Sequence, residues 1–399
     1  MPAQFRSRPW VAYVVAFPYP WGEAGSRRVH GICRSIVATG RDVLVIALPT
    51  PGTPYVAGSR LVIADSRSGG CVRTISRKAL PASALRRQWA HHVSGARDAL
   101  DLIERVSPYR PSHVIVYGTL TTPLLQVLRW GRANGVSVLA DIVERYSPRQ
   151  FRGGALSPGY VLSTAGFELV APQLDGVIAI SRHIESYFVA HGVRTLRIPP
   201  TVDLSQIPRG EPSSDRMTFG YFGSPGRKDL LAVVVEAFVR GRRASGRDDL
   251  RLIIGGDGTR AAASSRKGQG LEGVEFLGRI PQHEVSAVLG SLHATMLARP
   301  RARYAEAGYP TKVVESLSVG TPVLCNLTGD LGEVIREGET GWISSGPSIN
   351  EMASAFSRAA GTSHEDLVRM RQSSRSTAEE WFDAARYAGR LDEHLVATA

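Results

Sequence analysis

The chain has 399 residues, of which 43% are hydrophobic and 21% charged, so it is long enough for two domains that each bury their own core. Its three cysteines, Cys33, Cys71 and Cys325, are far apart and form no C-x-x-C pair. They indicate neither a disulfide framework nor a zinc site, and they favour a reducing compartment. No segment approaches the roughly 18 consecutive apolar residues that a membrane span needs, so we expect a cytoplasmic protein.

The net charge of +12 is unevenly distributed along the chain. Residues 1–200 carry 24 Lys and Arg against 11 Asp and Glu, a balance of +13, whereas residues 201–399 carry 24 against 25, a balance of −1. A basic N-terminal half suits an anionic acceptor or peripheral association with the inner membrane leaflet, although a high arginine content can equally reflect genomic base composition. Nucleic acid is not an expected partner, because the chain has no nucleic-acid motif and no arginine cluster interleaved with aromatic residues.

The first half of the chain predicts a doubly wound sheet. An apolar strand at 11–17, a glycine-containing loop, a helix at 30–38 and a strand at 42–48 form a β-loop-α-β unit. Further strands are predicted at 72–75, 113–117, 137–140 and 176–180, and further helices at 84–106, 122–134 and 182–191. Residues 49–70 are polar and predict no element, and the Pro, Ser and Asp-rich stretch 204–216 predicts an interdomain linker.

The second half repeats the same alternation. Strands are predicted at 217–222, 251–255, 274–277, 294–297, 321–325 and 342–343, and helices at 227–240, 283–289, 311–320 and 349–360. Two further helices are predicted after residue 360, the last at about 383–396. We therefore predict an α/β protein with a first domain at 1–203, a linker at 204–216 and a second domain at 217–378. Residues 379–399 are expected to pack back on the first domain.

The stretch from Tyr304 to Gly329 carries the clearest local signal. Pro310 presets a first helical turn and Thr311 can cap it, which leaves a helix N-terminus able to hold a phosphate. Lys312 and Glu315 follow one turn apart. They are either a cation and a carboxylate suited to a nucleotide or an ordinary i,i+3 surface ion pair. The chain has only four lysines, which favours a special use of Lys312 as a compact charge.

Two other places predict ligand contact. The glycine turn at 223–226 leads into a helix with Lys228 in its first turn, which is a second phosphate-compatible arrangement. Asp141 and Glu144 follow a strand, where parallel sheets bind ligands. They can be acceptor contacts or parts of a capped turn.

Seven motifs in this order resemble one enzyme family over nearly the full chain. They are G-E-A-G-S-R-R at 22–28, V-I-A-I-S-R-H at 177–183, G-Y-F-G-S-P-G-R-K-D at 220–229, R-L-I-I-G-G-D-G at 251–258, V-E-F-L-G-R-I-P at 274–281, G-Y-P-T-K-V-V-E at 308–315 and G-E-T-G-W-I at 338–343. Together they resemble the retaining nucleotide-sugar glycosyltransferases of the GT-B fold, namely glycosyltransferase family 4, also called glycosyl transferases group 1.

The resemblance implies two Rossmann-like domains that face a cleft, with the acceptor on the first and the sugar nucleotide on the second. It implies transfer of a sugar from a UDP or GDP donor to a glycan, a lipid-linked intermediate or a natural product. Retention of the anomeric configuration and independence from metals and cofactors are part of the same expectation. The absence of a D-x-D motif is consistent with metal independence.

The resemblance also assigns residues. It implies Lys228 and Arg227 as stabilisers of the diphosphate and Glu315 as the acceptor of hydrogen bonds from the ribose. The other donor-binding positions that it implies are Gly22, Gly25, Gly223, Ser224, Arg279, Ile280, Tyr309, Pro310, Thr311 and Lys312. Contacts to the acceptor are expected from Arg27, Asp141 and Glu144.

Two departures from the family pattern leave alternatives open. Ala307 stands where the family often has a first glutamate, with Glu306 one residue away, and Ser224 stands where an arginine is common. Arg227 can supply that missing charge. The alternatives are a non-catalytic nucleotide-sugar-binding partner subunit and another GT-B enzyme, such as a sugar-nucleotide epimerase or a phosphorylase.

Overall fold

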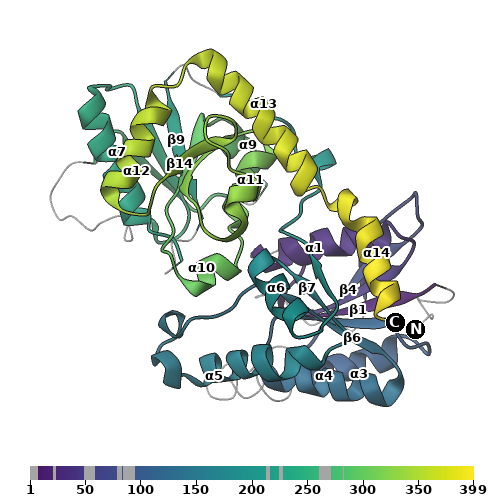
Figure 1. The fold of residues 1–399 in the computed structure, drawn as a ribbon. Coiled ribbons are helices and arrows are strands. Elements are labelled where there is room, and N and C mark those ends of the chain that lie inside the picture. Colours follow the sequence, from purple (N-terminus) through teal and green to yellow (C-terminus); the bar gives the residue numbers. More distant parts are fainter. Residues whose placement is uncertain are drawn as a thin grey trace. The chain divides into compact units, whose positions relative to one another are not determined.

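A computed structural model describes residues 8–20, 24–48, 59–78, 83, 95–212, 216–223, 228–259, 271–281 and 283–399. The chain divides into two compact units (Figure 1). Unit 1 comprises Met1–Val202 together with Ala384–Ala399, and unit 2 comprises Asp203–Asp383.

Unit 1 is built on an eight-stranded sheet of order β3-β4-β2-β1-β5-β6-β7-β8, parallel except for the antiparallel β3–β4 pair. Its strands are β1 (Trp10–Pro18), β2 (Asp42–Leu48), β3 (Arg60–Ala64), β4 (Cys71–Ser76), β5 (His113–Tyr117), β6 (Ser137–Ile142), β7 (Gly176–Ala179) and β8 (Thr195–Arg197). Its helices are α1 (Ala24–Val37), α3 (Gly95–Val106), α4 (Thr121–Asn134), α5 (Pro158–Ala165), α6 (Arg182–Ala190) and α14 (Ala388–Ala397).

Helices cover both faces of this sheet, which explains its continuous apolar strands. Figure 1 shows α3 and α4 below the sheet and α1 and α14 above it. Residues 10–15 of β1 and 42–47 of β2 are buried without alternation, as expected of parallel strands that are covered on both sides.

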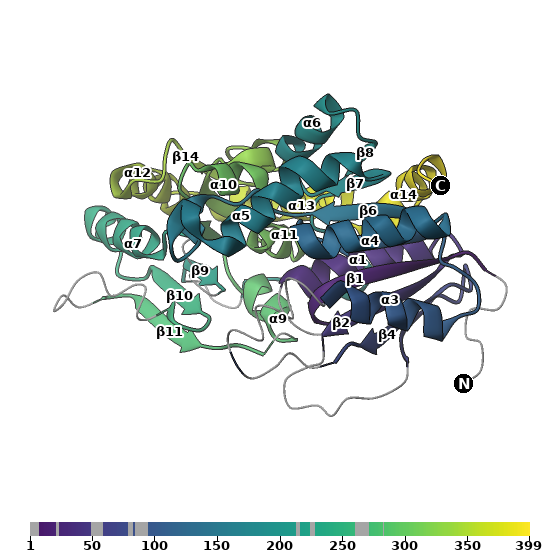
Figure 2. The ribbon, with the colours of Figure 1, turned by 90° about the horizontal axis from the view of Figure 1, so that it is seen from below.

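Unit 2 has a six-stranded parallel sheet of order β11-β10-β9-β12-β13-β14. Its strands are β9 (Thr218–Phe222), β10 (Arg251–Gly255), β11 (Val274–Gly278), β12 (Ala294–Leu297), β13 (Val323–Asn326) and β14 (Gly341–Ser344). Its helices are α7 (Leu231–Ser245), α9 (Val285–Gly290), α10 (Arg303–Ala307), α11 (Thr311–Ser318), α12 (Ile349–Ala360) and α13 (His364–Trp381). Figures 1 and 2 show α7 and α12 side by side, and α9 and α11 lie on the other face of the sheet.

Short helices complete both units. In unit 1 they are η2 (Pro148–Gln150), η3 (Gly154–Leu156), η4 (Gly166–Val170), η5 (Ala171–Gln173) and η8 (Ala384–Tyr387). In unit 2 they are η6 (Leu204–Gln206) and η7 (Gly329–Glu333).

The sequence analysis missed the strand β3, which lies inside the stretch 49–70 where no element was predicted. Strand β3 is at the edge of its sheet, and Arg60, Leu61 and Ala64 are exposed. An edge strand with little burial has no clear alternation of apolar and polar residues, so periodicity cannot reveal it. Helix α1 begins at Ala24, earlier than predicted.

The connection between the units differs from the predicted linker. Residues 204–212 belong to unit 2, where they form η6 and where Arg375 donates hydrogen bonds to the carbonyls of Leu204 and Ile207. Arg371 donates to the carbonyl of Gly210 in the same way, at 2.7 Å. The predicted boundary at 378/379 falls within α13, and the chain returns to unit 1 at Ala384.

Helix α14 is part of the core of unit 1. Leu391 and Leu395 are fully buried in the cluster that also contains Ile36 of α1 and Val45 of β2. The Ser35 hydroxyl donates to the carbonyl of Ala384 at 2.7 Å. The last turns of the chain therefore complete a core that is built mainly from its first half.

Candidate functional site

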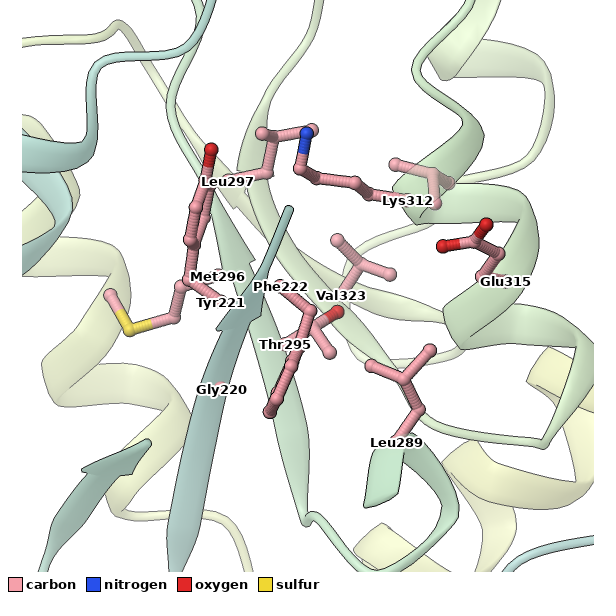
Figure 3. Close-up of a pocket in the computed structure, with 11 residues that line it drawn as sticks. Gly220, Tyr221, Phe222, Leu289, Thr295, Met296, Leu297, Lys312, Glu315 and Val323 are labelled. Atoms are coloured by element: carbon pink, nitrogen blue, oxygen red, sulfur yellow. The ribbon is translucent and has the colours of Figure 1, made fainter. Parts of the chain in front are cut away.

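A pocket in unit 2 lies where the strand order of the sheet reverses, between β9 and β12. In open parallel sheets this reversal opens a crevice at the carboxyl ends of the strands, where ligands bind. The pocket has room for about one water molecule. Its lining residues are Gly220, Tyr221, Phe222, Leu289, Thr295, Met296, Leu297, Lys312, Val313, Glu315 and Val323 (Figure 3).

Helix α11 brings two of the predicted residues to this pocket. Figure 3 shows Lys312 and Glu315 projecting from α11 toward the space bordered by Tyr221 and Phe222. The opposite side of the helix is fixed, since Val314 and Leu317 are buried in the core of unit 2. This division into an apolar side and a polar side follows from helical spacing.

The start of α11 differs in detail from the prediction. Pro310 is the N-cap, with φ −75° and ψ 106°, and Thr311 is the first helical residue. No side chain makes a capping hydrogen bond there, so Thr311 is not the cap, and the first turn is open, which was the other possibility for this segment. A helix start without a side-chain cap leaves backbone N–H groups for another acceptor.

The ammonium group of Lys312 is paired with Asp229 rather than left in solvent. Its Nζ lies 2.7 Å from the Asp229 Oδ2, and the Tyr221 hydroxyl donates to the same oxygen at 2.9 Å. The Arg299 Nε lies 3.8 Å from the other carboxylate oxygen. Lys312 also lies over the Tyr221 ring, 5.4 Å from its centroid.

Gly223 makes room for this lysine. A Cβ at position 223 would lie 2.5 Å from the Lys312 Cε, and the glycine has φ +134°, a conformation that other residues rarely adopt. The stem of Lys312 therefore passes over the first residue of the glycine turn. The two phosphate-compatible segments predicted from the sequence are in contact at this point.

Lys228 adds a third positive charge near Asp229. Desolvation by the surrounding protein, followed by the positive charges of Arg299 and Lys312, lowers the pKa of Lys228 to about 8, and the Asp229 carboxylate opposes this shift. The side chain remains exposed to solvent, which weakens the desolvation part of this effect. Repulsion between neighbouring cations is then a substantial cause of the shift.

Arg299 and Asp229 are site residues that the sequence analysis did not identify. Arg299 is 4% exposed, and its backbone is fixed by Asn326, whose side chain accepts from its N–H and donates to its carbonyl, both at 2.9 Å. Burial lowers the pKa of Arg299, and Asp229 raises it. The available signal was an arginine two residues after the buried strand β12, and an aspartate next to Lys228.

Three other residues predicted to contact the donor, Arg279, Ile280 and Tyr309, are not among the residues that line the pocket. Arg279 is exposed and lies 3.9 Å from Asp257, and Ile280 packs against the apolar cluster around Phe222. The Tyr309 ring is buried edge-on against Phe382, with centroids 5.9 Å apart. Only backbone groups of Tyr309 are therefore suited to contact a ligand.

The Glu306 side chain is engaged in a hydrogen bond within unit 2, so it is not a direct replacement for the glutamate that is missing at position 307. Its carboxylate accepts a hydrogen bond from the backbone N–H of Gly329 at 2.7 Å, which holds the loop after β13. Ala307 is fully buried, so a carboxylate there would not fit without rearrangement.

Asp141, predicted as an acceptor contact, has a structural role instead. It is fully buried, and both its oxygens accept from Arg28: Oδ1 lies 2.7 Å from Nη2 and 2.9 Å from Nε, and Oδ2 lies 3.0 Å from Nε. The Tyr13 hydroxyl donates to it at 2.5 Å, and burial together with this carboxylate raises the pKa of Tyr13. A carboxylate held in this way has no oxygen left for a substrate.

The remaining predictions fall on unit 1 or outside the description. Gly25 and Arg27 lie in α1, and burial lowers the pKa of Arg27. Glu144 is half-buried after β6. Gly22, Ser224 and Arg227 lie outside the described residues.

Two searches of the described part of the chain were negative. No group of three or more His, Cys, Asp or Glu side chains there is arranged to hold a metal ion. None of its helices is long and apolar enough to cross a membrane.

Comparison with known sequences gave one match, confined to the second half of the chain. Residues 216–361 match the model of the family described as glycosyl transferases group 1. This segment contains the pocket, Asp229, Arg299 and all of α11. No curated protein matched the chain.

Comparison with solved structures gave matches over the whole chain. Sucrose-phosphate synthase from Thermosynechococcus elongatus has a TM-score of 0.72 at 15% identity and covers 98% of this chain and 100% of its own. Trehalose-6-phosphate synthase OtsA has a TM-score of 0.70 at 10% identity, with 98% and 99% covered. Anabaena HepE in complex with UDP and glucose has a TM-score of 0.65 at 14% identity, with 97% and 99% covered. The chain therefore has the two-domain GT-B fold of these proteins, and its residues 216–361 match the glycosyl transferases group 1 family.

Proposed function

We propose that the protein is a glycosyltransferase that moves a sugar from a nucleoside-diphosphate donor to an acceptor with retention of the anomeric configuration. The observation that carries this proposal is the pocket at the reversal point of the unit 2 sheet. There, a carboxylate, Glu315, and a cation, Lys312, lie at an uncapped helix start, and Lys228 and Arg299 are further cations around Asp229, the partner of Lys312. The family match at 216–361 supports the same chemistry.

The proposed donor site offers separate partners for the ribose and for the diphosphate of a nucleoside diphosphate sugar. Glu315 can accept hydrogen bonds from two ribose hydroxyls, since a carboxylate has acceptor oxygens in a fork. Lys228, Lys312 and the N–H groups at the start of α11 suit the diphosphate. Anabaena HepE has been solved with UDP-glucose, which supports UDP as the first nucleotide to test and GDP as the second.

The reaction follows from where charge develops. The bond between the anomeric carbon and the phosphate oxygen breaks, and its electron pair stays on the departing diphosphate. The acceptor oxygen bonds to the anomeric carbon from the same face, and its proton passes to the departing oxygen. Lys228 and Lys312 stabilise the negative charge that grows on the diphosphate, so the proposed reaction needs no metal, cofactor or protein nucleophile.

The acceptor is expected to meet unit 1, which holds most of the excess positive charge. We propose a glycan, a lipid-linked intermediate or a natural product as acceptor, with peripheral association at the inner membrane leaflet as one setting. The balance of +13 in residues 1–200 supports an anionic acceptor.

Ligand-dependent thermal stability tests the donor site. We would measure melting with UDP, GDP, ADP, TDP and CMP, without added metal, for the wild type and for Glu315→Ala. A ligand at a hundred times its dissociation constant adds about 2.7 kcal/mol to the free energy of unfolding. We expect one diphosphate to stabilise the wild type and to lose most of that effect in Glu315→Ala.

The matched control is Glu365→Ala, which removes an exposed glutamate that pairs with Arg369 on α13. This variant should respond to the diphosphate as the wild type does. Stabilisation by no nucleotide would contradict the proposal. Binding without slow donor hydrolysis or transfer would favour the non-catalytic partner subunit.

A further inference from the structure

One carboxylate, Asp229, joins three segments at the edge of the unit 2 sheet. Its side chain is 8% exposed, and its Oδ2 accepts from Tyr221 at the end of β9 and from Lys312 at the start of α11. Its Oδ1 lies 3.8 Å from Arg299, which follows β12. The next residue, Leu230, donates its N–H to the carbonyl of Ala298 at 2.8 Å, so backbone and side chain fix the same junction.

The charges around Asp229 are unbalanced. Among the described residues, three cations, Lys228, Lys312 and Arg299, lie around the Asp229 carboxylate, and Glu306 acts on Arg299 more weakly than Asp229 does. The formal charge of Asp229 and the three cations together is +2. The mutual repulsion of three such cations is energetically unfavourable, because like charges at short range repel strongly where water is partly excluded.

Arg299 is the cation of this cluster that most needs the Asp229 carboxylate. Its guanidinium is buried, and its Nε has no hydrogen-bond partner among the described residues. Glu306, Tyr304 and Cys325 also face it and favour its charged form, but less than Asp229 does. A buried cation without its anion is costly, so the arrangement of this edge depends on the Asp229 carboxylate.

We propose that Asp229 is the positioning residue of the donor site, where it holds Lys312 and Arg299 in place and offsets their repulsion with Lys228. This inference rests on the proposed function for the identity of the ligand, a nucleoside diphosphate. Asp229 acts through the lysines and does not itself bind the anion. The site is thereby charged and ordered before the diphosphate arrives, which lowers the cost of binding.

The effect on Lys228 has a defined sign. The pKa of Lys228 is lowered to about 8, first by partial loss of hydration and then by the positive charges of Arg299 and Lys312. The negative charge of Asp229 opposes this shift. Removal of the Asp229 charge should lower the pKa of Lys228 further. Removal of the Lys312 charge should raise it.

Lysine NMR tests these two shifts without any ligand. The chain has only four lysines, Lys78, Lys228, Lys267 and Lys312, so reductive ¹³C-methylation gives four lysine signals besides that of the α-amino group. Lys228→Arg and Lys312→Met assign the signals of these two lysines. In Asp229→Asn the midpoint of Lys228 should move to lower pH, and in Lys312→Met it should move to higher pH. Opposite shifts of one signal are not expected from a merely structural change.

Binding measurements complete the test. At pH 7.5, Asp229→Asn should bind UDP, or the diphosphate that stabilises the wild type, roughly tenfold or more weakly, with partial rescue in Asp229→Glu. Asp249→Asn, which removes a surface partner of Arg247, is the matched control and should bind as the wild type does. Circular dichroism checks that each variant is folded. If Asp229→Asn does not fold, the NMR comparison is made between the wild type and Lys312→Met.

Two outcomes would overturn the role of Asp229. One is a Lys228 midpoint that is the same in the wild type, Asp229→Asn and Lys312→Met. The other is diphosphate binding to Asp229→Asn that is as tight as in the wild type. If the wild type binds no diphosphate, the proposed function fails, and the NMR midpoints still decide whether Asp229 controls the charge of Lys228.

Discussion

At the scale of single residues, two acidic side chains near strand ends have different roles. Asp141 at the end of β6 is buried between Arg28 and Tyr13 and holds the interior of unit 1 together. Asp229 after β9 pairs with Lys312, which lines the pocket of unit 2, and we propose that it positions the cations of a donor site. Residue type and position on a strand cannot distinguish these roles, because burial and partner identity come from segments far apart in the sequence.

Lys228 leads to a prediction about pH. Its pKa is lowered to about 8, so its positive charge is largely present at pH 7 and is lost as the pH rises through 8 to 9. A diphosphate favours the charged form, and its affinity should therefore fall over this range. Calorimetric titration of the wild type with UDP, or with the diphosphate that binds, at pH 7, 8 and 9 measures the effect.

Lys228→Arg is the control for this pH dependence. Arginine stays charged throughout the range, so the variant should show a much flatter profile whatever its absolute affinity. An equally steep fall in Lys228→Arg would assign the titration to another group.

At the scale of elements, the site is assembled where β9, β12 and α11 meet. The glycine turn after β9 and the first turn of α11 were each predicted as phosphate-compatible segments. The stem of Lys312 connects them over Gly223, and this contact depends on the absence of a side chain there. The position of Lys312 in α11 thus requires a glycine at position 223 in the turn after β9.

Gly223→Ala tests this contact. The added Cβ would lie 2.5 Å from the Lys312 Cε at a φ of +134°, so both strain and displacement of the lysine are expected. The free energy of unfolding should fall by about 1–3 kcal/mol, and diphosphate binding should weaken by more than this loss of stability explains. Urea unfolding and calorimetric titration at a temperature where the variant is folded separate the two effects.

Gly389→Ala is the matched control, because a Cβ there meets nothing within 4 Å. It lies in α14 and should leave diphosphate binding unchanged while stability stays equal or rises slightly. If Gly223→Ala keeps wild-type affinity, the path of Lys312 over this glycine is not important for binding.

At the scale of the whole molecule, the chain ends inside the unit in which it begins. In unit 1 the Thr398 hydroxyl lies 3.3 Å from the His113 Nε2, and His394 of α14 is also buried. Burial, followed by nearby arginines, lowers the pKa of both histidines to about 4. Arg41 contributes at His113 and Arg194 at His394, while Asp175 opposes the shift of His113.

These histidines predict acid sensitivity of the C-terminal segment. Their folded pKa values lie below the ordinary value of 6.5, so the unfolded form binds more protons between pH 6.5 and 4. The stability that they contribute is present above pH 6.5 and is lost as the pH falls toward 4. Hydrogen exchange of α14, corrected for intrinsic rates, should show protection that declines over this range.

Helix α12 of unit 2 is the internal control, and its protection should change less. His394→Gln removes one titrating group and should reduce the pH dependence in α14. Equal loss of protection in α12 and α14 would instead indicate general acid unfolding.

The sequence by itself determined the α/β class and the repeated strand and helix alternation, and it singled out the segment that brings Lys312 and Glu315 to the pocket. Covered parallel strands are continuously apolar, and a proline followed by Lys312 and Glu315 at helical spacing marks a helix start with polar groups on one side. These signals are local, because each depends on residues within one or two turns. Gly22, Ser224 and Arg227 stay predictions.

Only the tertiary structure decided which charges belong together. Asp229, Arg299 and Lys312 are separated by long stretches of sequence and become neighbours where the strand order reverses between β9 and β12. The same holds for Asp141 with Arg28, for Arg371 and Arg375 with residues 204–210, and for α14 in the core of unit 1. Such pairings depend on chain topology and on burial, and neither is encoded in the periodicity of a single segment.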